Sequence, residues 1–399
     1  MFSSLGVRNF RVYWLGMLVS LVGTWIQQVA QSWLVFELTN SVLLLGLVGF
    51  LGSIPILILS LFGGILADRL NKRNILIVTQ IIFMCLAFTL AILTQLKVIA
   101  PYQIMIIAIL NGIVMAFDAP ARQAIVVELV GKPNLFNAIA LNSVAFNSSR
   151  IIGPALAGIL IATIGMSGCF YINGVSFLAV IVALYFIRIG HVHIPLKGNG
   201  TLKDLKDGFN FIKNNRLIQA LIAMVGVVSL FGVAHVVLMP VFANDVLKVG
   251  IKGLGVLMSA AGCGALLGAL ILARLGDFKF KGKLLLSSAM VFSVSLIIFS
   301  LSKIYLLSIF ALILIGFSSV TAVALVNTLL QTKVEDRFRG RVMSVFMITF
   351  AGMMPFGNLI AGGLAHSMGV SFAVMAGGIV CAIFFTIVSI VYPAIAKIN

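Results

Sequence analysis

The stretch that decides the fold is Gly63-Gly64-Ile65-Leu66-Ala67-Asp68-Arg69-Leu70-Asn71-Lys72-Arg73, which separates two long apolar runs. It places one acid and three bases within six residues, from Asp68 to Arg73. Each flanking run is long enough for a helix that crosses a hydrocarbon core about 30 Å thick, which takes about 20 residues. We therefore interpret the charged stretch as a loop in water between two membrane-spanning helices.

The rest of the chain repeats this alternation of apolar runs and short charged loops. Of its 399 residues, 61% are hydrophobic and only 9% are charged, a composition that a soluble domain of this size does not keep in water. The runs are continuously apolar, which predicts helices rather than barrel strands and thus an all-α polytopic membrane protein. The expected spans are twelve: residues 12–36, 43–67, 75–95, 102–119, 136–164, 167–189, 217–242, 254–273, 284–301, 305–330, 342–366 and 372–391.

The net charge of +17 by itself suggests a nucleic-acid partner, but the distribution of the bases does not. Lys and Arg gather in loops on one side of the predicted membrane, which is the positive-inside pattern of membrane topology. This pattern puts both termini in the cytoplasm and makes the lipid bilayer, rather than nucleic acid, the expected environment. The bases outside this pattern are Lys97, Lys248, Lys252 and Lys303 on the other side, and Arg150 inside a span.

The longest connection, residues 190–216, divides the chain into two predicted six-span halves, residues 1–189 and 217–399. Within this linker, residues 201–214 have the pattern of an amphipathic helix capped by Thr201. The halves also resemble each other as repeats, since an offset of 204 residues brings small residues into register. The matched pairs are Gly64 with Gly268, Gly153 with Gly357, Ala157 with Ala361, and Gly158 with Gly362.

The 63–73 loop resembles the loop between the second and third helices of major facilitator superfamily transporters, with Asn71 in place of a second glycine. Other stretches resemble the bacterial exporter branch that contains the enterobactin exporter and macrolide-efflux proteins. The resemblance implies two pseudo-symmetric six-helix bundles, secondary transport of a small-molecule substrate, a monomer, and the bacterial inner membrane. These other stretches are residues 9–14, 117–123, 137–142, 150–154, 339–344 and 355–358.

The resemblance also implies a cytoplasmic gate at the 63–73 loop. Asp68 would lie against the start of span eleven, near Arg341, because a helix N-terminus attracts an acid. The bases of the loop would pair with an acid at the end of span four, a place that Asp118 fits, with Arg69 or Lys72 as its partner. The alternative is that Asp68 and Arg69 belong to a solvated turn. The residues expected in the gate are Gly64, Asp68, Arg69, Lys72, Arg73 and Asp118.

Span five holds Arg150, a cation inside a helix, which costs about 2.5–3.5 kcal/mol at the bilayer centre. Such a cation usually faces a polar cavity; the alternatives are that it reaches the membrane interface or forms a structural ion pair. Residues 153–158 follow and resemble the G-P-x-x-G-G motif of proton-coupled exporters, with Ala157 in place of one glycine. Pro154 removes a backbone donor, while Gly153 and Gly158 permit close approach of helices.

Polar side chains on several predicted central spans suggest a water-accessible substrate cavity. Each of them alone is more often a contact between helices than a ligand contact. As a set, they are the candidate cavity lining. The predicted cavity residues are Thr24, Gln27, Gln28, Gln31, Asn111, Asn142, Asn147, Arg150, His235 and Asn327.

Proton coupling needs a titratable group near such a cavity. The candidates are His235 by residue type, Asp118 on the cytoplasmic side, and Glu37 near the outer end of span one. The sequence has no phosphate-binding P-loop, and its four cysteines fall inside apolar runs without metal-ligand spacing. We therefore expect no cofactor and no metal, with protons as the coupling ion.

These features favour a secondary exporter of a small amphipathic molecule, siderophore-like or drug-like, that works by alternating access. A lipid flippase or an importer of the same fold stays open. An integral-membrane enzyme is disfavoured because His191 and His193, the only close histidine pair, have no carboxylate nearby in the sequence. A channel or receptor is disfavoured by the duplicated layout. The substrate is not identified, although Arg150 hints at an anionic or electron-rich one.

Overall fold

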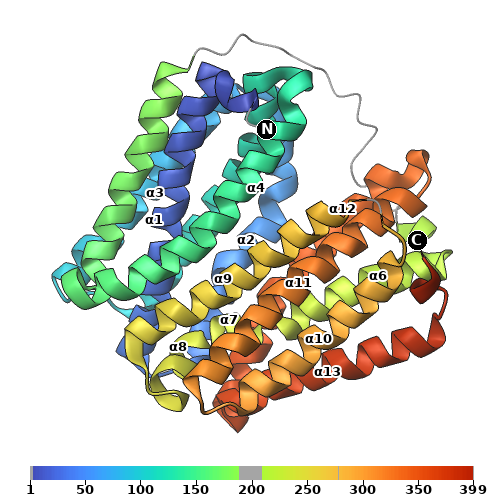
Figure 1. The fold of residues 1–399 in the computed structure, drawn as a ribbon. Helices are drawn as coiled ribbons and strands as arrows, with labels where there is room; N and C mark the ends of the chain where they lie inside the picture. The colour runs from blue at the N-terminus through green and yellow to red at the C-terminus, as the bar shows by residue number, and fades with distance from the viewer. Residues whose placement is uncertain (1–2, 188–208, 277, 399) are drawn as a thin grey trace. The chain divides into compact units, whose positions relative to one another are not determined.

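The computed structural model describes residues 3–187, 209–276 and 278–398 of the chain (Figure 1). Within these ranges all regular structure is helical, and eleven helical stretches are long and apolar enough to cross a membrane. Helices satisfy every backbone N–H and C=O within one segment, which is what a hydrocarbon environment demands. The prediction of an all-α polytopic membrane protein is confirmed.

The helices follow the predicted spans closely at most of their ends. In the first half they are α1 (Arg8–Thr39), α2 (Val42–Arg69), α3 (Lys72–Gln95) and α4 (Pro101–Phe186). In the second half they are α6 (Arg216–Val227), α7 (Ala234–Val237), α8 (Met239–Val241), α9 (Gly250–Leu275), α10 (Lys281–Leu301), α11 (Tyr305–Lys333), α12 (Asp336–Met368) and α13 (Val370–Val391). Short 3-10 turns, η1 (Ser3–Gly6) and η4 (Ile395–Lys397), lie near the two ends of the chain.

Two glycines break α4 into three helical segments. Gly131 (φ 67°) and Gly165 (φ 75°) take the left-handed conformation that glycine adopts at low cost. The first segment runs to Gly131, beyond residue 119 where the sequence predicted the end of span four. That prediction was wrong because Pro120 is accommodated inside the helix, which stops only at Gly131 and the following Pro133. Gly165 separates the expected fifth and sixth spans.

The seventh expected span is irregular and continues to Val246. After α6 the chain forms a π-helical segment, η2 (Val228–Gly232), and after α8 a second one, η3 (Phe242–Val246). Pro240 in α8 has no N–H to donate, which interrupts the hydrogen-bond ladder of the helix. π-helical turns are frequent at functional sites, and His235, a predicted site residue, lies between these two segments.

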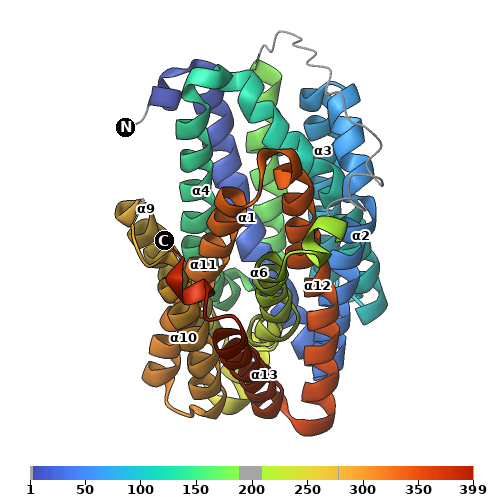
Figure 2. The same ribbon diagram turned by 90° about the vertical axis from the view of Figure 1, so that its right-hand side faces the viewer.

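The described residues fall into two compact units. The first unit takes its residues from Met1–Asn40, Leu51–Leu196 and Gly250–Ser259, and the second from Ser41–Phe50, Lys197–Val249 and Ala260–Asn399. In the first unit α1 and α3 pack against α4, around a core that includes the fully buried Phe10, Tyr13 and Leu184. In the second unit α10 packs against both α11 and α13 (Figure 2).

The predicted amphipathic helix of the linker, residues 201–214, lies mostly outside the described residues. Residues 209–213 are described and helical, with Ile212 buried and Phe209 exposed. Phe211 stacks on Phe338 near the start of α12, with 4.5 Å between the ring centroids. The end of this linker therefore packs against α12.

Candidate functional site

Polar side chains of the charged loop between α2 and α3 cap α3 and connect the loop to the end of α4. Asn71 caps α3, because its side-chain oxygen Oδ1 accepts a hydrogen bond from the backbone N–H of Arg73 at 3.0 Å. The guanidinium of Arg73 donates to the carbonyl oxygens of Leu184 (2.6 Å) and Tyr185 (3.0 Å), at the end of α4. Asn71, which stands where the resembled motif has glycine, thus starts α3, and Arg73 anchors the loop to the first unit.

The remaining charges of the loop differ in their surroundings. Lys72 forms an ion pair with Glu128 near the end of the first segment of α4, with 2.7 Å between Nζ and Oε1. Each of these two side chains keeps 17% of its surface exposed. Asp68 and Arg69 are exposed at the end of α2. The expected contact of Asp68 with the start of span eleven joins residues of different units and stays a prediction.

Asp118 lies in a different polar network from the predicted one. Its side chain is 1% exposed, and its Oδ1 accepts hydrogen bonds from Thr79 (2.7 Å) and Gln80 (2.8 Å) of α3. Its Oδ2 lies 2.9 Å from both Nε and Nη2 of Arg122, one helical turn further along α4. Asp118 is therefore paired with Arg122 and not with Arg69 or Lys72.

Glu128 and Arg122 were not predicted as site residues from the sequence, each for an identifiable reason. Ending span four at residue 119 left the acid at position 128 outside any helix, so its reach to Lys72 went unnoticed. The pairing of Asp118 with Arg122 has an i, i+4 spacing, which is a recognised signal for an ion pair on one helix face. That signal was available in the sequence. The acid that pairs with a base of the loop, Lys72, is thus Glu128, ten residues further along α4 than Asp118.

Arg150 is half-buried on the middle segment of α4 and has no ion pair or hydrogen bond with another described residue. It lies between the breaks at Gly131 and Gly165, roughly 22–28 Å from each at 1.5 Å per residue. Asn142 Oδ1 and Ser149 Oγ, on the same segment, are buried and also lack partners among the described residues. The segment thus carries a central cation and polar groups that the described chain leaves unsatisfied.

The exporter-like motif of span five crosses the start of α9 at close range. A side chain at Gly255 would put its Cβ 2.5 Å from the carbonyl oxygen of Pro154 and 3.2 Å from Gly158. Close by, the hydroxyl of Ser259 donates to the carbonyl oxygen of Ile151 at 2.7 Å. Gly153 packs directly on Trp25 of α1. The small residues of the motif therefore permit two close helix contacts within the first unit.

The second unit contains an equivalent crossing between the start of α2 and α12. A Cβ at Gly46 would lie 2.5 Å from the carbonyl oxygen of Asn358 and 2.8 Å from Gly362. Asn358 and Gly362 follow Pro154 and Gly158 by the same 204 residues that relate the predicted repeats. The α4 and α12 sides of the two crossings therefore use matching positions, while their partners Gly46 and Gly255 differ by 209 residues and are out of this register.

The predicted cavity residues have varied environments. Gln27 is buried and its Oε1 accepts from Nδ2 of Asn173 at 2.7 Å, while Asn327 accepts from Gln331 at 2.6 Å. Thr24 donates to a carbonyl of its own helix. Of these three, Gln27 has the contact between helices that was the alternative interpretation, while the hydrogen bonds of Thr24 and Asn327 lie within their own helices. Gln28 is exposed, Gln31 and Asn111 are half-buried, and Asn147 donates to the carbonyl of Ser143.

The candidates for proton coupling also differ in their burial and hydrogen bonds. His235 is buried in the irregular seventh span, and its Nδ1 lies 2.7 Å from the carbonyl oxygen of Gly232. Glu37 is exposed near the end of α1 and accepts a hydrogen bond from the indole N–H of Trp33 at 2.9 Å. Among the described residues, no group of three or more His, Cys, Asp or Glu side chains is placed to hold a metal ion.

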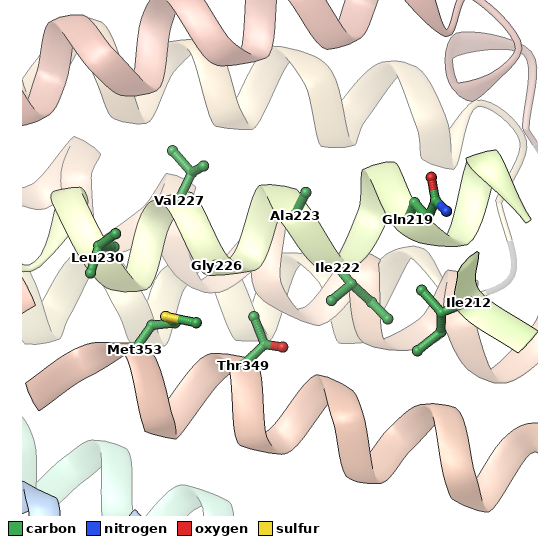
Figure 3. A pocket seen from close by; sticks show the side chains of 9 residues that line it. All are labelled: Ile212, Gln219, Ile222, Ala223, Gly226, Val227, Leu230, Thr349 and Met353. Atoms are coloured by element: carbon green, nitrogen blue, oxygen red, sulfur yellow. The ribbon is translucent and has the colours of Figure 1, made fainter. Parts of the chain in front are cut away.

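A pocket of about 340 Å³ lies between α6 and α12 in the second unit (Figure 3). Its lining comes from α6 with the adjoining η2, from Thr349 and Met353 of α12, and from Ile212 just before α6. None of the predicted cavity residues lines it. Its signal in the sequence was weak, because apolar side chains on membrane helices are common and do not distinguish a pocket from packing.

Known proteins resemble this chain over nearly its whole length. The family model described as "Transmembrane secretion effector" matches residues 1–396. The staphyloferrin A transporter of Staphylococcus aureus is 27% identical over 90% of this chain and 91% of its own. Macrolide efflux protein A of Streptococcus pyogenes is 24% identical, covering 98% and 96% of the two chains. The enterobactin exporter EntS of Shigella flexneri is 25% identical, covering 90% and 85%.

Solved structures of low sequence identity share the fold. A bacterial homologue of the human lysosomal transporter Spinster, in an inward-facing and unoccupied conformation, superposes with a TM-score of 0.76. The two chains are 13% identical and each is covered to 98%. The helices described above are thus arranged in a known transporter fold.

Proposed function

Because the chain belongs to the transmembrane secretion effector family of the major facilitator superfamily, it is a multi-pass membrane transporter and not an enzyme, and we propose that it exports a small amphipathic molecule. The substrate carries an anionic or electron-rich part, as a siderophore or a drug-like compound does. A proton gradient drives export by alternating access of the two halves. The protein works as a monomer in the bacterial cytoplasmic membrane, with both termini in the cytoplasm.

The observation that carries this proposal is the unpaired Arg150 in the middle of span five. A cation at such a depth is costly unless a partner or water compensates it. The described residues provide no acid for it. Reaching an interface requires covering about 15 Å, half of the hydrocarbon core. A carboxylate or phenolate of the substrate supplies the missing partner, and a guanidinium binds such groups in a bidentate way.

Export, rather than import, is supported by two independent features. Two of the relatives have efflux or export in their names, macrolide efflux protein A and the enterobactin exporter. The Gly153–Gly158 motif resembles that of proton-coupled exporters, and it makes the close crossing with α9. We assign a gate on the cytoplasmic side of the membrane to Asp68 and the loop that follows it.

For proton coupling we assign His235 as the first candidate. Asp118 has both carboxylate oxygens occupied by four donors, which suits a structural role. Glu37 is exposed at the end of α1. His235 is buried where the seventh span departs from regular helix, a position that can change its hydrogen bonds during a conformational cycle.

The test is uptake into inside-out proteoliposomes with an acidic lumen. The panel holds catecholate and carboxylate iron chelators, a macrolide and a lipophilic cation. Arg150→Gln is compared with Arg216→Gln, a matched loss of charge at the exposed start of α6. We expect gradient-dependent uptake of anionic chelators that falls at least about tenfold in Arg150→Gln, equivalent to about 1.4 kcal/mol, and is retained in Arg216→Gln.

Other results would point elsewhere. Uptake of the cation alone, unaffected by Arg150→Gln, would make the protein a multidrug pump in which Arg150 is structural. Uptake only into right-side-out vesicles would indicate an importer. Movement of labelled phospholipid without movement of any soluble compound would indicate a flippase.

A further inference from the structure

The described end of the linker, residues 209–215, which we call the linker end, is fixed to the start of α6. Asn215 caps α6, because its Oδ1 accepts a hydrogen bond from the backbone N–H of Ile218 at 3.2 Å. Nε2 of Gln219 donates to the carbonyl oxygen of Lys213 at 2.6 Å, so α6 also holds the turn that precedes it. The linker end is therefore attached to α6 by hydrogen bonds on both sides of this turn.

The linker end also contacts the start of α12, through Phe211. The ring of Phe211 stacks on that of Phe338, with 4.5 Å between the centroids and 18° between the planes, an arrangement that aromatic pairs favour. The neighbouring Ile212 is 7% exposed and lies beside the pocket between α6 and α12 (Figure 3). Phe209, by contrast, is 64% exposed. The linker end thus joins the starts of two helices.

Phe338 is in turn close to Arg341, which lies one helical turn further along α12. The guanidinium carbon of Arg341 is 5.9 Å from the centroid of the Phe338 ring, within the distance of about 6 Å at which a ring attracts a cation. A guanidinium is weakly hydrated and stacks readily on aromatic faces. A ring that Phe211 holds in place therefore restricts where this guanidinium lies. Three side chains in contact connect the linker end to Arg341.

We propose that Phe211 is a positioning residue for transport, which acts through Phe338 to hold the start of α12 and the guanidinium of Arg341 in place. This inference rests on the proposed cytoplasmic gate, in which Arg341 lies near Asp68. Without the stack, the guanidinium takes more orientations, and each closure of the gate has to order it again. Because Phe211 is assigned no substrate contact, its loss should lower the maximal transport rate and leave KM unchanged.

The first experiment measures whether Phe211 holds the linker end. Ile212→Cys is made in full-length protein whose Cys85 and Cys263 are replaced by Ser, and its rate of labelling by a maleimide is measured in nanodiscs. We expect Phe211→Leu to raise this rate about fivefold, the effect of losing one aromatic pair. Phe211→Tyr keeps the stack and should leave the rate unchanged, as should the exposed control Phe209→Leu. Equal rates in Phe211→Leu and its parent would overturn the proposal.

The second experiment measures uptake kinetics in proteoliposomes and keeps the native Ile212, so it does not depend on the cysteine variant. Phe211→Leu should lower the maximal rate about fivefold and leave KM within about twofold, while Phe211→Tyr should retain the rate. Arg341→Gln should also lower the maximal rate, and adding Phe211→Leu should lower it no further, because both changes remove the same contact. A raised KM at unchanged maximal rate, or effects that multiply in the double variant, would contradict the proposal.

The two experiments separate this inference from the proposed export. Labelling needs no transport, so absence of uptake by the unmodified protein would count against export, while the labelling rates would still decide whether Phe211 holds the linker end. Faster labelling in Phe211→Leu together with unchanged uptake would show that the linker end packs on α12 without positioning it for transport. That result would also overturn the inference.

Discussion

Asp118 and Arg122 form an ion pair within the first unit, one helical turn apart on α4, in which Oδ2 lies 2.9 Å from two nitrogens of the guanidinium. Thr79 and Gln80 donate to the other carboxylate oxygen and so tie α3 to α4 through the same side chain. A residue that the sequence suggested as a gate or a proton carrier is therefore the centre of a packed network. Its replacement should affect stability as well as transport.

Asp118→Asn should destabilise the protein. The substitution leaves Arg122, whose side chain is 22% exposed, without its counter-charge, and removal of one partner of a buried pair costs on the order of 3 kcal/mol. Thermal unfolding in detergent measures the change, with the exposed Glu37→Gln as a control that should stay within about 0.5 kcal/mol. The double variant Asp118→Asn/Arg122→Gln should recover part of the loss. An unfolding temperature equal to that of the parent would contradict the network assignment.

Reversing the charges of Lys72 and Glu128 tests whether this pair supports the loop. Lys72→Glu and Glu128→Lys should each lower transport severalfold, because like charges then face each other at 2.7 Å. The double reversal should restore most of the activity. Stability should change by less than about 1 kcal/mol, since partly exposed pairs contribute little. The measurement is initial uptake rate in proteoliposomes. A double variant no better than the weaker single variant would argue against the pairing.

Gly255→Ala should impair the protein at the crossing of α9 with the exporter-like motif. The added Cβ would lie 2.5 Å from the Pro154 carbonyl oxygen, so the helices must move apart. We expect at least about tenfold less transport, or about 1.4 kcal/mol. Gly363→Ala is the matched control, because a Cβ at Gly363 meets nothing within 4 Å. Equal activity of both variants would show that the close approach is dispensable.

Asp68→Asn should insert and fold normally yet lose transport if the charge at the end of α2 belongs to the cytoplasmic gate. Its side chain is exposed, so no stability change is expected from buried contacts. Asp245→Asn is the control, since Asp245 is also exposed and is hydrogen-bonded by the neighbouring Asn244. Membrane yield and uptake are measured together. Full transport by Asp68→Asn would indicate that Asp68 belongs to a solvated turn and not to a gate.

The sequence predicted the structure best where one physical constraint acts on a long segment. The requirement that backbone groups be paired in lipid made long apolar runs readable as helices. Prediction was weakest at polar positions inside those runs. The sequence could not tell that Gln27 bonds to Asn173, or that span four passes Pro120 and ends at Gly131. The first outcome depends on a residue far away along the chain, and the second on the left-handed backbone of Gly131, which the residue type permits but does not require.

The sequence by itself determined that this is a helical membrane protein, because hydrophobicity and loop charge follow directly from residue order. Its motifs indicated the transporter superfamily by resemblance. Only the tertiary structure decided that Lys72 meets Glu128, that Thr79 and Gln80 join Asp118, and that Arg150 stays unpaired among the described residues. It also revealed the pocket between α6 and α12. Contacts between side chains span a few ångströms, and which residues come that close depends on how helices pack, which residue order does not state.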